Sequence, residues 1–138
     1  MLNVVVKNTE RFLLSVPKTK RKKYGQFFTN MSTAKFMASL FCFDHSKPCL
    51  EILDAGAGTG ILATAVIQKL IDDGYKGRIH VTCYETDNFV MPVLEENMRL
   101  STVLPNVTCS IKTDNYITSQ NFSNYTLFGG EDLHYDYI

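Results

Sequence analysis

A glycine-rich segment preceded by an aspartate has the clearest chemical meaning in this sequence. It runs from Asp54 to Gly60 and reads Asp-Ala-Gly-Ala-Gly-Thr-Gly. Glycines let a backbone approach a ligand closely and adopt positive φ angles. The free N–H groups at the start of a following helix favour polar or anionic ligand groups. The segment therefore predicts a loop that binds a nucleotide-like ligand.

The glycine spacing favours one class of ligand. A dinucleotide-binding loop reads G-x-G-x-x-G, whereas here the third glycine comes one residue early, at Gly60, and Ile61 takes the place of the glycine. Asp54 would also repel a pyrophosphate. A ligand with an ammonium group and no phosphate suits this arrangement better than NAD, and S-adenosylmethionine (SAM) is such a ligand.

Three acidic residues follow three predicted strands. Asp54 ends the first strand, Glu85 the second, and Asp114 follows the third. Glu85 is placed to accept hydrogen bonds from ribose hydroxyls, and Asp114 to accept one from an adenine amino group. Each acid alone is equally consistent with a solvated surface, but all three beside a glycine loop indicate one site. Asp87 is better interpreted as a cap or first-turn acid of the next helix.

Alternating strands and helices would position these residues. The apolar patterns predict strands and helices from residue 49 onward, in the order strand 49–54, helix 60–73, strand 79–85, helix 90–101, strand 107–112, an irregular stretch 115–133, and the start of a strand at 135–138. This alternation predicts an α/β fold with a mostly parallel sheet, doubly wound if helices cover both faces. Ligands bind such sheets at the carboxyl ends of the strands, near the point where strand order reverses.

The amino-terminal part divides into an extension and a helix. Residues 1–24 form an extension of uncertain structure, and residues 25–138 a partial ligand-binding domain. Ser32 is a good N-cap for a helix that runs to about residue 43. Its apolar face is predicted to consist of Ala34, Phe36, Met37, Leu40 and Phe41.

Three motifs resemble a known family. Gly25-Gln26-Phe27-Phe28-Thr29, Leu53 to Gly60 and Tyr84-Glu85-Thr86-Asp87 resemble the N6-adenine DNA methyltransferases of restriction–modification systems. More narrowly, they resemble the subgroup in which the methionine-binding motif X precedes motif I. The resemblance covers about residues 22 to 138 and implies a Rossmann-like SAM-dependent methyltransferase fold, truncated after the fourth strand. One departure is Asn30, where the family usually has proline.

The resemblance implies a role for each matching position. Phe27, Phe28 and Thr29 would border the methionine end of SAM, with Asp54, Gly56, Gly58 and Gly60 at its amino-acid part and sulfonium. Glu85 would hold the ribose and Asp114 the adenine amino group. Thr86 or Tyr116 would flank the adenine ring.

The family's catalytic motif, Asn-Pro-Pro-aromatic, is absent. The four prolines are all isolated, and Tyr135 to Ile138 resembles the strand that leads into that motif. We therefore expect the SAM-binding part of an adenine-N6 DNA methyltransferase, with no catalytic residue of its own and no activity alone. The alternative is a non-catalytic SAM-fold module that binds a partner chain.

Charge and composition add expectations about partners. The 14 basic and 14 acidic residues balance, but five cations gather within six residues: Lys18, Lys20, Arg21, Lys22 and Lys23. This run would contact DNA phosphate weakly, or serve as a solvated connector. Cys42, Cys49, Cys83 and Cys109 show no CxxC pairing and indicate buried, reduced thiols in a cytoplasmic protein. No metal site is expected from the three histidines, and no membrane segment or signal peptide is recognised.

Overall fold

The computed structural model describes residues 1–17, 28–119 and 134–138. Within them, a parallel three-stranded sheet has the order β1-β2-β3, formed by β1 (Cys49–Asp54), β2 (Arg78–Tyr84) and β3 (Val107–Lys112). The register aligns Leu50, Ile79 and Val107 across the three strands. The parallel sheet predicted from the sequence is confirmed, and each strand lies within one residue of its predicted bounds.

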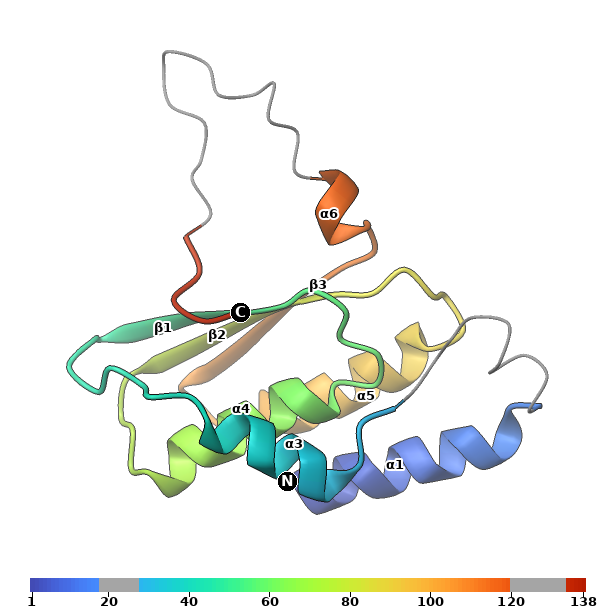
Figure 1. Ribbon diagram of the computed structural model, residues 1–138, viewed down its shortest axis with the longest axis horizontal. Helices are drawn as coiled ribbons and strands as arrows, with labels where there is room; N and C mark the ends of the chain where they lie inside the picture. Colours follow the sequence, from blue (N-terminus) through green and yellow to red (C-terminus); the bar gives the residue numbers. More distant parts are fainter. Residues whose placement is uncertain (18–27, 120–133) are drawn as a thin grey trace, which may run out of the picture.

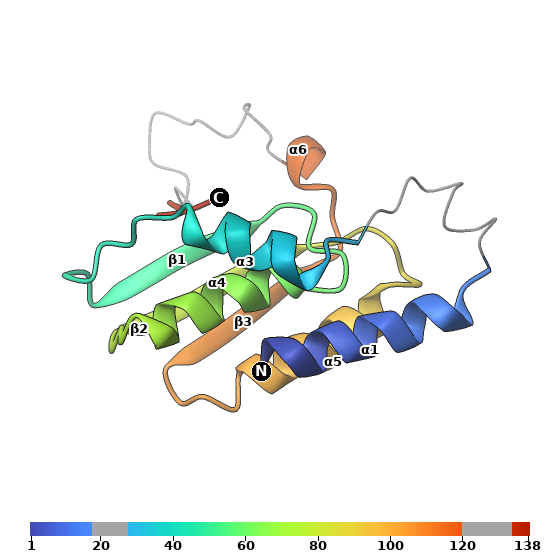
Figure 2. The same cartoon turned by 60° about the horizontal axis from the view of Figure 1, so that its bottom comes forward.

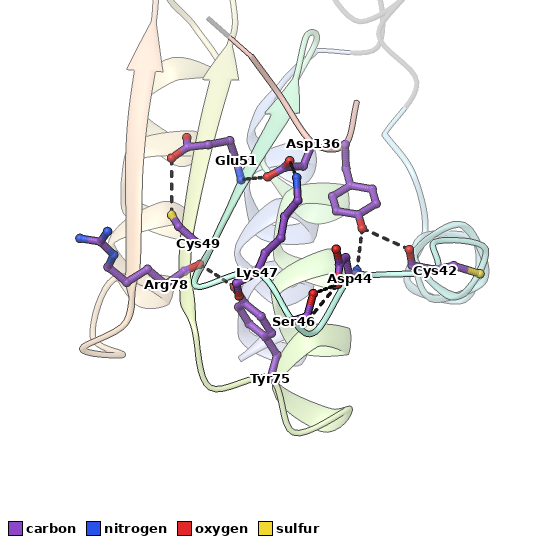
Figure 3. Close-up of polar contacts among 10 residues, drawn as sticks. Cys42, Asp44, Ser46, Lys47, Cys49, Glu51, Tyr75, Arg78 and Asp136 are labelled. Carbon is purple, nitrogen blue, oxygen red and sulfur yellow. Dashed lines mark hydrogen bonds and ion pairs between the residues drawn. The ribbon is translucent and has the colours of Figure 1, made fainter.

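The carboxyl-terminal residues lie against the other edge of β1. Tyr137 forms a parallel bridge to Ile52, and the Leu53 amide donates to the Tyr137 carbonyl at 2.8 Å. Figure 3 shows Asp136 between the Lys47 ammonium and the Glu51 backbone amide, which donates to it at 2.9 Å. The chain therefore adds strands on one side of β1 and then returns to its other side. The point where strand order reverses lies at β1, as in a Rossmann-like sheet.

In the described part of the chain, four helices lie on one side of this sheet: α1 (Leu2–Ser15), α3 (Met31–Ser39), α4 (Ile61–Asp72) and α5 (Met91–Ser101) (Figures 1 and 2). Helices α4 and α5 contact β2 and β3, and α1 and α3 pack against α4. A short helix, α6 (Tyr116–Ser119), forms a single turn after β3. Within the described ranges the sheet is thus covered by long helices on one face only.

The positions of helices α4 and α5 in the sequence follow from the spacing of their apolar residues and from the glycines and proline near their ends. Helix α4 begins after Gly60, whose φ is 79°, and ends where the Tyr75 amide donates to the Leu70 carbonyl beyond the left-handed Gly74. Helix α5 accepts Pro92 in its first turn, where no helical N–H is needed. The buried side chains of both helices pack on the sheet's apolar face, which forms the core.

Helix α3 differs from its prediction. Its cap is Asn30, whose side chain accepts the Thr33 amide at 2.9 Å, and the helix ends at Ser39. Ser32 is therefore not the cap, because Asn30 comes earlier and has the extended backbone that a cap requires. Only Ala34 and Ala38 are buried on α4, while Phe36 and Leu40 remain 63% and 66% exposed.

The amino-terminal segment is helical and packed. Helix α1 places Leu2, Val5 and Thr9 against α4 and α5, and its first residues share the core. It ends at Ser15, and the next residue, Val16, has the extended backbone that a residue before proline prefers. Within the described ranges, no helix combines the length and apolarity needed to cross a membrane.

All four cysteines carry free thiols. Only Cys83 is fully buried, whereas Cys42 is exposed. The prediction of buried thiols is therefore wrong for Cys42, which follows the end of α3 instead of lying in a buried apolar run.

Candidate functional site

Two small cavities meet at Gly56, at the carboxyl ends of the three strands. One, of about 180 Å³, is lined mainly by the ends of β2 and β3 and includes Glu85, Thr86, Asp114 and Tyr116. The other, of about 90 Å³, lies between the glycine loop and the start of α3 and includes Phe28, Thr29, Asp54 and Gly58. Gly56 lines both. A ligand that spanned the two cavities would pass over this residue.

Asp54 presents a buried, unpartnered oxygen. Its Oδ2 atom is buried and receives no hydrogen bond from any residue that the structure describes. Burial raises the pKa of the Asp54 carboxyl, against the lowering effect of the Gly56 and Ala63 backbone amides and together with the nearby charge of Glu85. An uncompensated buried carboxylate oxygen is costly. A ligand ammonium group would remove that cost.

Glu85 is engaged with the loop backbone. Its Oε2 accepts the Gly58 amide at 2.9 Å, and its Oε1 accepts the Thr86 and Asp87 amides at 2.8 Å each. A carboxylate has about four acceptor positions, so three are used by the protein. One remains on Oε2, on the atom that already contacts the glycine loop.

The three loop glycines have different surroundings. Gly60 has a φ of 79°, and a Cβ atom there would stand 2.6 Å from Met98 Cε and 3.0 Å from Leu94 Cδ1. Gly58 has a φ of 53°, with Phe28 as its nearest side chain. Gly56 is not in the left-handed region, and apart from its two chain neighbours no described residue would come within 4 Å of a Cβ atom there. The described residues thus require glycine at position 60 and do not require it at position 56.

The structure brings together most of the residues predicted from the sequence. All of them line the two cavities except Phe27, which lies outside the described residues, and Gly60, which is buried beneath the loop. The rings of Tyr84 and Tyr116 pack edge to face with 5.1 Å between their centroids. This contact places Tyr116 at one wall of the cavity of about 180 Å³. The cationic run at 18–23 also lies outside the described residues.

Sequence reasoning missed two residues that hold the loop. The Thr59 hydroxyl lies 2.8 Å from that of Thr9 in α1, and the Thr59 carbonyl accepts the Asn97 side chain of α5 at 2.8 Å. In the sequence, such residues can be noticed as polar residues on the apolar face of a predicted helix. Asn97 interrupts the apolar stripe of Leu94 and Met98, and a buried amide needs a partner.

A larger, almost wholly apolar cavity of about 430 Å³ adjoins the site. Side chains of α3 and α4, the end of β1, and Ile138 line it. Asp54, Ala55 and Leu62 also line one or other of the two small cavities. Among the described residues, no group of three or more His, Cys, Asp or Glu side chains is placed to hold a metal ion.

Sequence comparison gives this site a context. The chain is 33% identical over 113 residues to the Type II methyltransferase M.BsuBI of Bacillus subtilis, covering 82% of this chain and 22% of the relative. It is 39% identical over 88 residues to the Type II methyltransferase M.PstI of Providencia stuartii, covering 61% and 16%. This chain is a relative of Type II methyltransferases. It spans about a fifth of the length of the curated relatives that it matches.

Other comparisons are less informative. No protein-family model matches the chain. A Klebsiella pneumoniae protein described as an O-methyltransferase aligns with a TM-score of 0.47 at 20% identity, over 80% of this chain and 42% of that one. A Listeria monocytogenes protein described as a class I SAM-dependent methyltransferase aligns with a TM-score of 0.48 at 17% identity, over 69% and 30%. The fold assignment rests on the strand order and the bridge to β1.

Proposed function

We propose that this chain binds SAM and forms the cofactor-binding part of an adenine-N6 DNA methyltransferase. The observation that carries the proposal is the pair of cavities meeting at Gly56, with the unpartnered Asp54 oxygen in one and Glu85 in the other. When bound, SAM supplies an electrophilic methyl group on its sulfonium. A cytoplasmic location remains a prediction from the sequence.

The residues divide the ligand between the two cavities. Asp54 takes the ammonium group, with Phe28 and Thr29 beside the methionine chain. Glu85 accepts a hydrogen bond from one ribose hydroxyl at the unused acceptor position of Oε2. It could accept a second ribose hydroxyl if that hydroxyl replaced the Gly58 amide. Thr86, Asp114 and Tyr116 surround the adenine in the cavity of about 180 Å³.

Binding is tested by titration calorimetry with S-adenosylhomocysteine (SAH) and, separately, NAD. We expect SAH to bind and NAD to bind more weakly or not at all, because Asp54 repels a pyrophosphate. Equal or tighter NAD binding would refute the ligand assignment. The variant Asp54→Asn should lose most SAH affinity because it cannot pair with an ammonium group.

DNA methylation is proposed for the whole protein and not for these residues alone. Transfer needs an adenine turned out of the helix and held in line with the sulfonium methyl, and such orientation contributes several powers of ten in rate. The Asn-Pro-Pro-aromatic motif that would hold the base is absent from the sequence. Labelled SAM and unmodified DNA should therefore give no transfer with this chain. Robust turnover would show that the catalytic site is elsewhere.

A second function is a module that binds a partner chain. The apolar cavity beside β1 favours it, because exposed Met37, Leu40 and Ile138 side chains line that cavity. Adding the segment of M.BsuBI that follows the matched region, as a separate polypeptide, tests this function. A stable complex that stays unable to bind SAH would favour the module. A complex that methylates adenine would favour the enzyme.

A further inference from the structure

A buried polar network joins α1, the glycine loop and α5. Its central members, Thr9, Thr59 and Asn97, are 2%, 1% and 0% exposed. Thr9 contacts Thr59 at 2.8 Å, Asn97 donates to the Thr59 carbonyl at 2.8 Å, and Asn8 donates to Asn97 Oδ1 at 3.0 Å. Three elements far apart in the sequence therefore converge on one loop residue.

The partners fix the direction of each hydrogen bond. Thr9 Oγ1 lies 2.9 Å from the Val5 carbonyl, which can only accept, so the single Thr9 hydroxyl proton points there. The Thr59 hydroxyl then donates to Thr9. Asn97 must turn its amide nitrogen to the Thr59 carbonyl, since two oxygens facing one another would repel. Both the hydroxyl and the carbonyl of Thr59 are thus satisfied from outside the loop.

Thr59 stands where the loop most needs to be held. It lies between Gly58 and Gly60, whose φ angles are 53° and 79°. Glycine reaches many backbone conformations and so specifies none strongly. The hydrogen bonds to Thr59, together with the packing of Met98 and Leu94 against Gly60, select one conformation of this part of the loop.

Helix α1 also supports the far wall of the smaller cavity. The Phe12 ring of α1 meets Phe28 at 6.2 Å in an edge-to-face arrangement and Phe89 at 5.6 Å. Phe28 in turn lies over Gly58, 3.6 Å from where a Cβ atom would stand. Helix α1 therefore contacts both the loop and the aromatic side chain that faces it.

We propose that α1 is part of the ligand-binding unit, with Thr9 and Asn97 as positioning residues for the glycine loop and Phe12 as the support of Phe28. This inference rests on the proposed function, since it assumes that the loop binds SAM. It includes α1 in the binding unit, which the sequence alone predicts to begin at residue 25.

The test compares three variants of the same chain. Thr9→Val keeps the side-chain shape but removes the hydroxyl that accepts the Thr59 proton. Thr9→Ser keeps the hydroxyl. Ile79→Val removes a methylene from a fully buried residue at the amino end of β2, at the opposite end of the strands from the loop. Melting temperatures, SAH dissociation constants and amide exchange rates are measured for each.

We expect Thr9→Val to weaken SAH binding roughly tenfold, as the loss of one buried hydrogen bond implies. In this variant, the backbone amides of Gly58, Thr59 and Gly60 should exchange hydrogen faster than in the unaltered chain. The increase should be larger than the variant's loss of global stability alone would produce. Thr9→Ser should bind like the unaltered chain, and Ile79→Val should stay within about twofold of it.

The inference is overturned if Thr9→Val and Ile79→Val change affinity and loop exchange only in proportion to their stability losses. Absence of SAH binding by the unaltered chain would instead refute the proposed function. In that case the exchange rates, which need no ligand, still decide whether Thr9 holds the loop.

Discussion

The two ends of the glycine loop differ in how far other parts of the protein contact them. At the Gly60 end, Thr59 has its polar groups satisfied by α1 and α5, and side chains of α5 fill the space beside Gly60. At the Gly56 end, no described residue beyond its chain neighbours lies within 4 Å of an added Cβ, and nearby Asp54 carries a buried oxygen that none of these residues satisfies. One end is completed by the protein, whereas the other is left incomplete.

The contrast separates what the fold needs from what a ligand needs. A glycine required by packing is explained by its neighbours, and Gly60 is such a residue. Under the proposed function, Gly56, which no described residue requires, lies beside the unpartnered Asp54 oxygen where a ligand would complete the site. A substitution at the Gly60 end should therefore reduce mainly the stability of the fold. A substitution at the Gly56 end should reduce mainly the affinity for the ligand.

The largest effect on folding is expected for Gly60→Ala. The left-handed backbone costs an alanine about 1–2 kcal/mol, and contact with Met98 and Leu94 adds about 1–3 kcal/mol, reduced where the end of Met98 can move. Chemical denaturation measures the loss. Gly74→Ala is the matched control, because Gly74 has the same φ of 79° with nothing within 4 Å. Equal losses would show that the packing against α5 contributes nothing.

A smaller effect is expected for Glu85→Gln, which tests the side of the loop that faces β2. Glutamine can still accept the Thr86 and Asp87 amides, but its NH₂ group would face the Gly58 amide, donor against donor. We expect a loss of about 1–2 kcal/mol in the free energy of unfolding. Glu96→Gln, on the exposed surface of α5, makes the same chemical change without a loop contact and should be neutral. A loss as large at position 96 would contradict the role of Glu85.

Unlike the two substitutions above, Asp54→Asn should raise the stability of the fold at neutral pH. The pKa of Asp54 is raised above its ordinary value of 3.8, mainly by burial, so the folded chain binds this proton more tightly than the unfolded chain. Stability from this group is complete below pH 3.8 and is lost as the pH rises through the raised pKa. The asparagine variant has no such loss.

Thermal melts across the acid-to-neutral range check this expectation. The two chains should agree at the acid end, and the variant should melt a few degrees higher near pH 7. Its asparagine carbonyl can still accept the Gly56 and Ala63 amides. A variant that is less stable at neutral pH would mean that the Asp54 charge is already compensated.

The incomplete end was predictable from the sequence, and the completed end was not. Asp54, Glu85 and the glycines are recognisable because strand ends and loop spacing are local properties. The contact between Thr9 and Thr59 joins residues 50 positions apart, and no local pattern specifies which helix meets the loop. Likewise, the spacing of apolar residues in α3 could not show that Ala34 and Ala38, and not Phe36, would face α4.

Gly56→Ala should have the smallest effect on folding and is the sharpest test of the contrast. The φ of Gly56 lies outside the left-handed region, and no described residue beyond its chain neighbours comes within 4 Å of an added Cβ. Alanine should therefore change the free energy of unfolding by less than about 1 kcal/mol, with a gain if it restricts the unfolded chain. The added methyl group would stand where the two cavities meet, so SAH affinity should fall at least about tenfold. Melting curves and calorimetry on one preparation measure both quantities. Unchanged affinity would show that the ligand does not pass over Gly56, whereas a large stability loss would show that the fold, and not the ligand, requires glycine there.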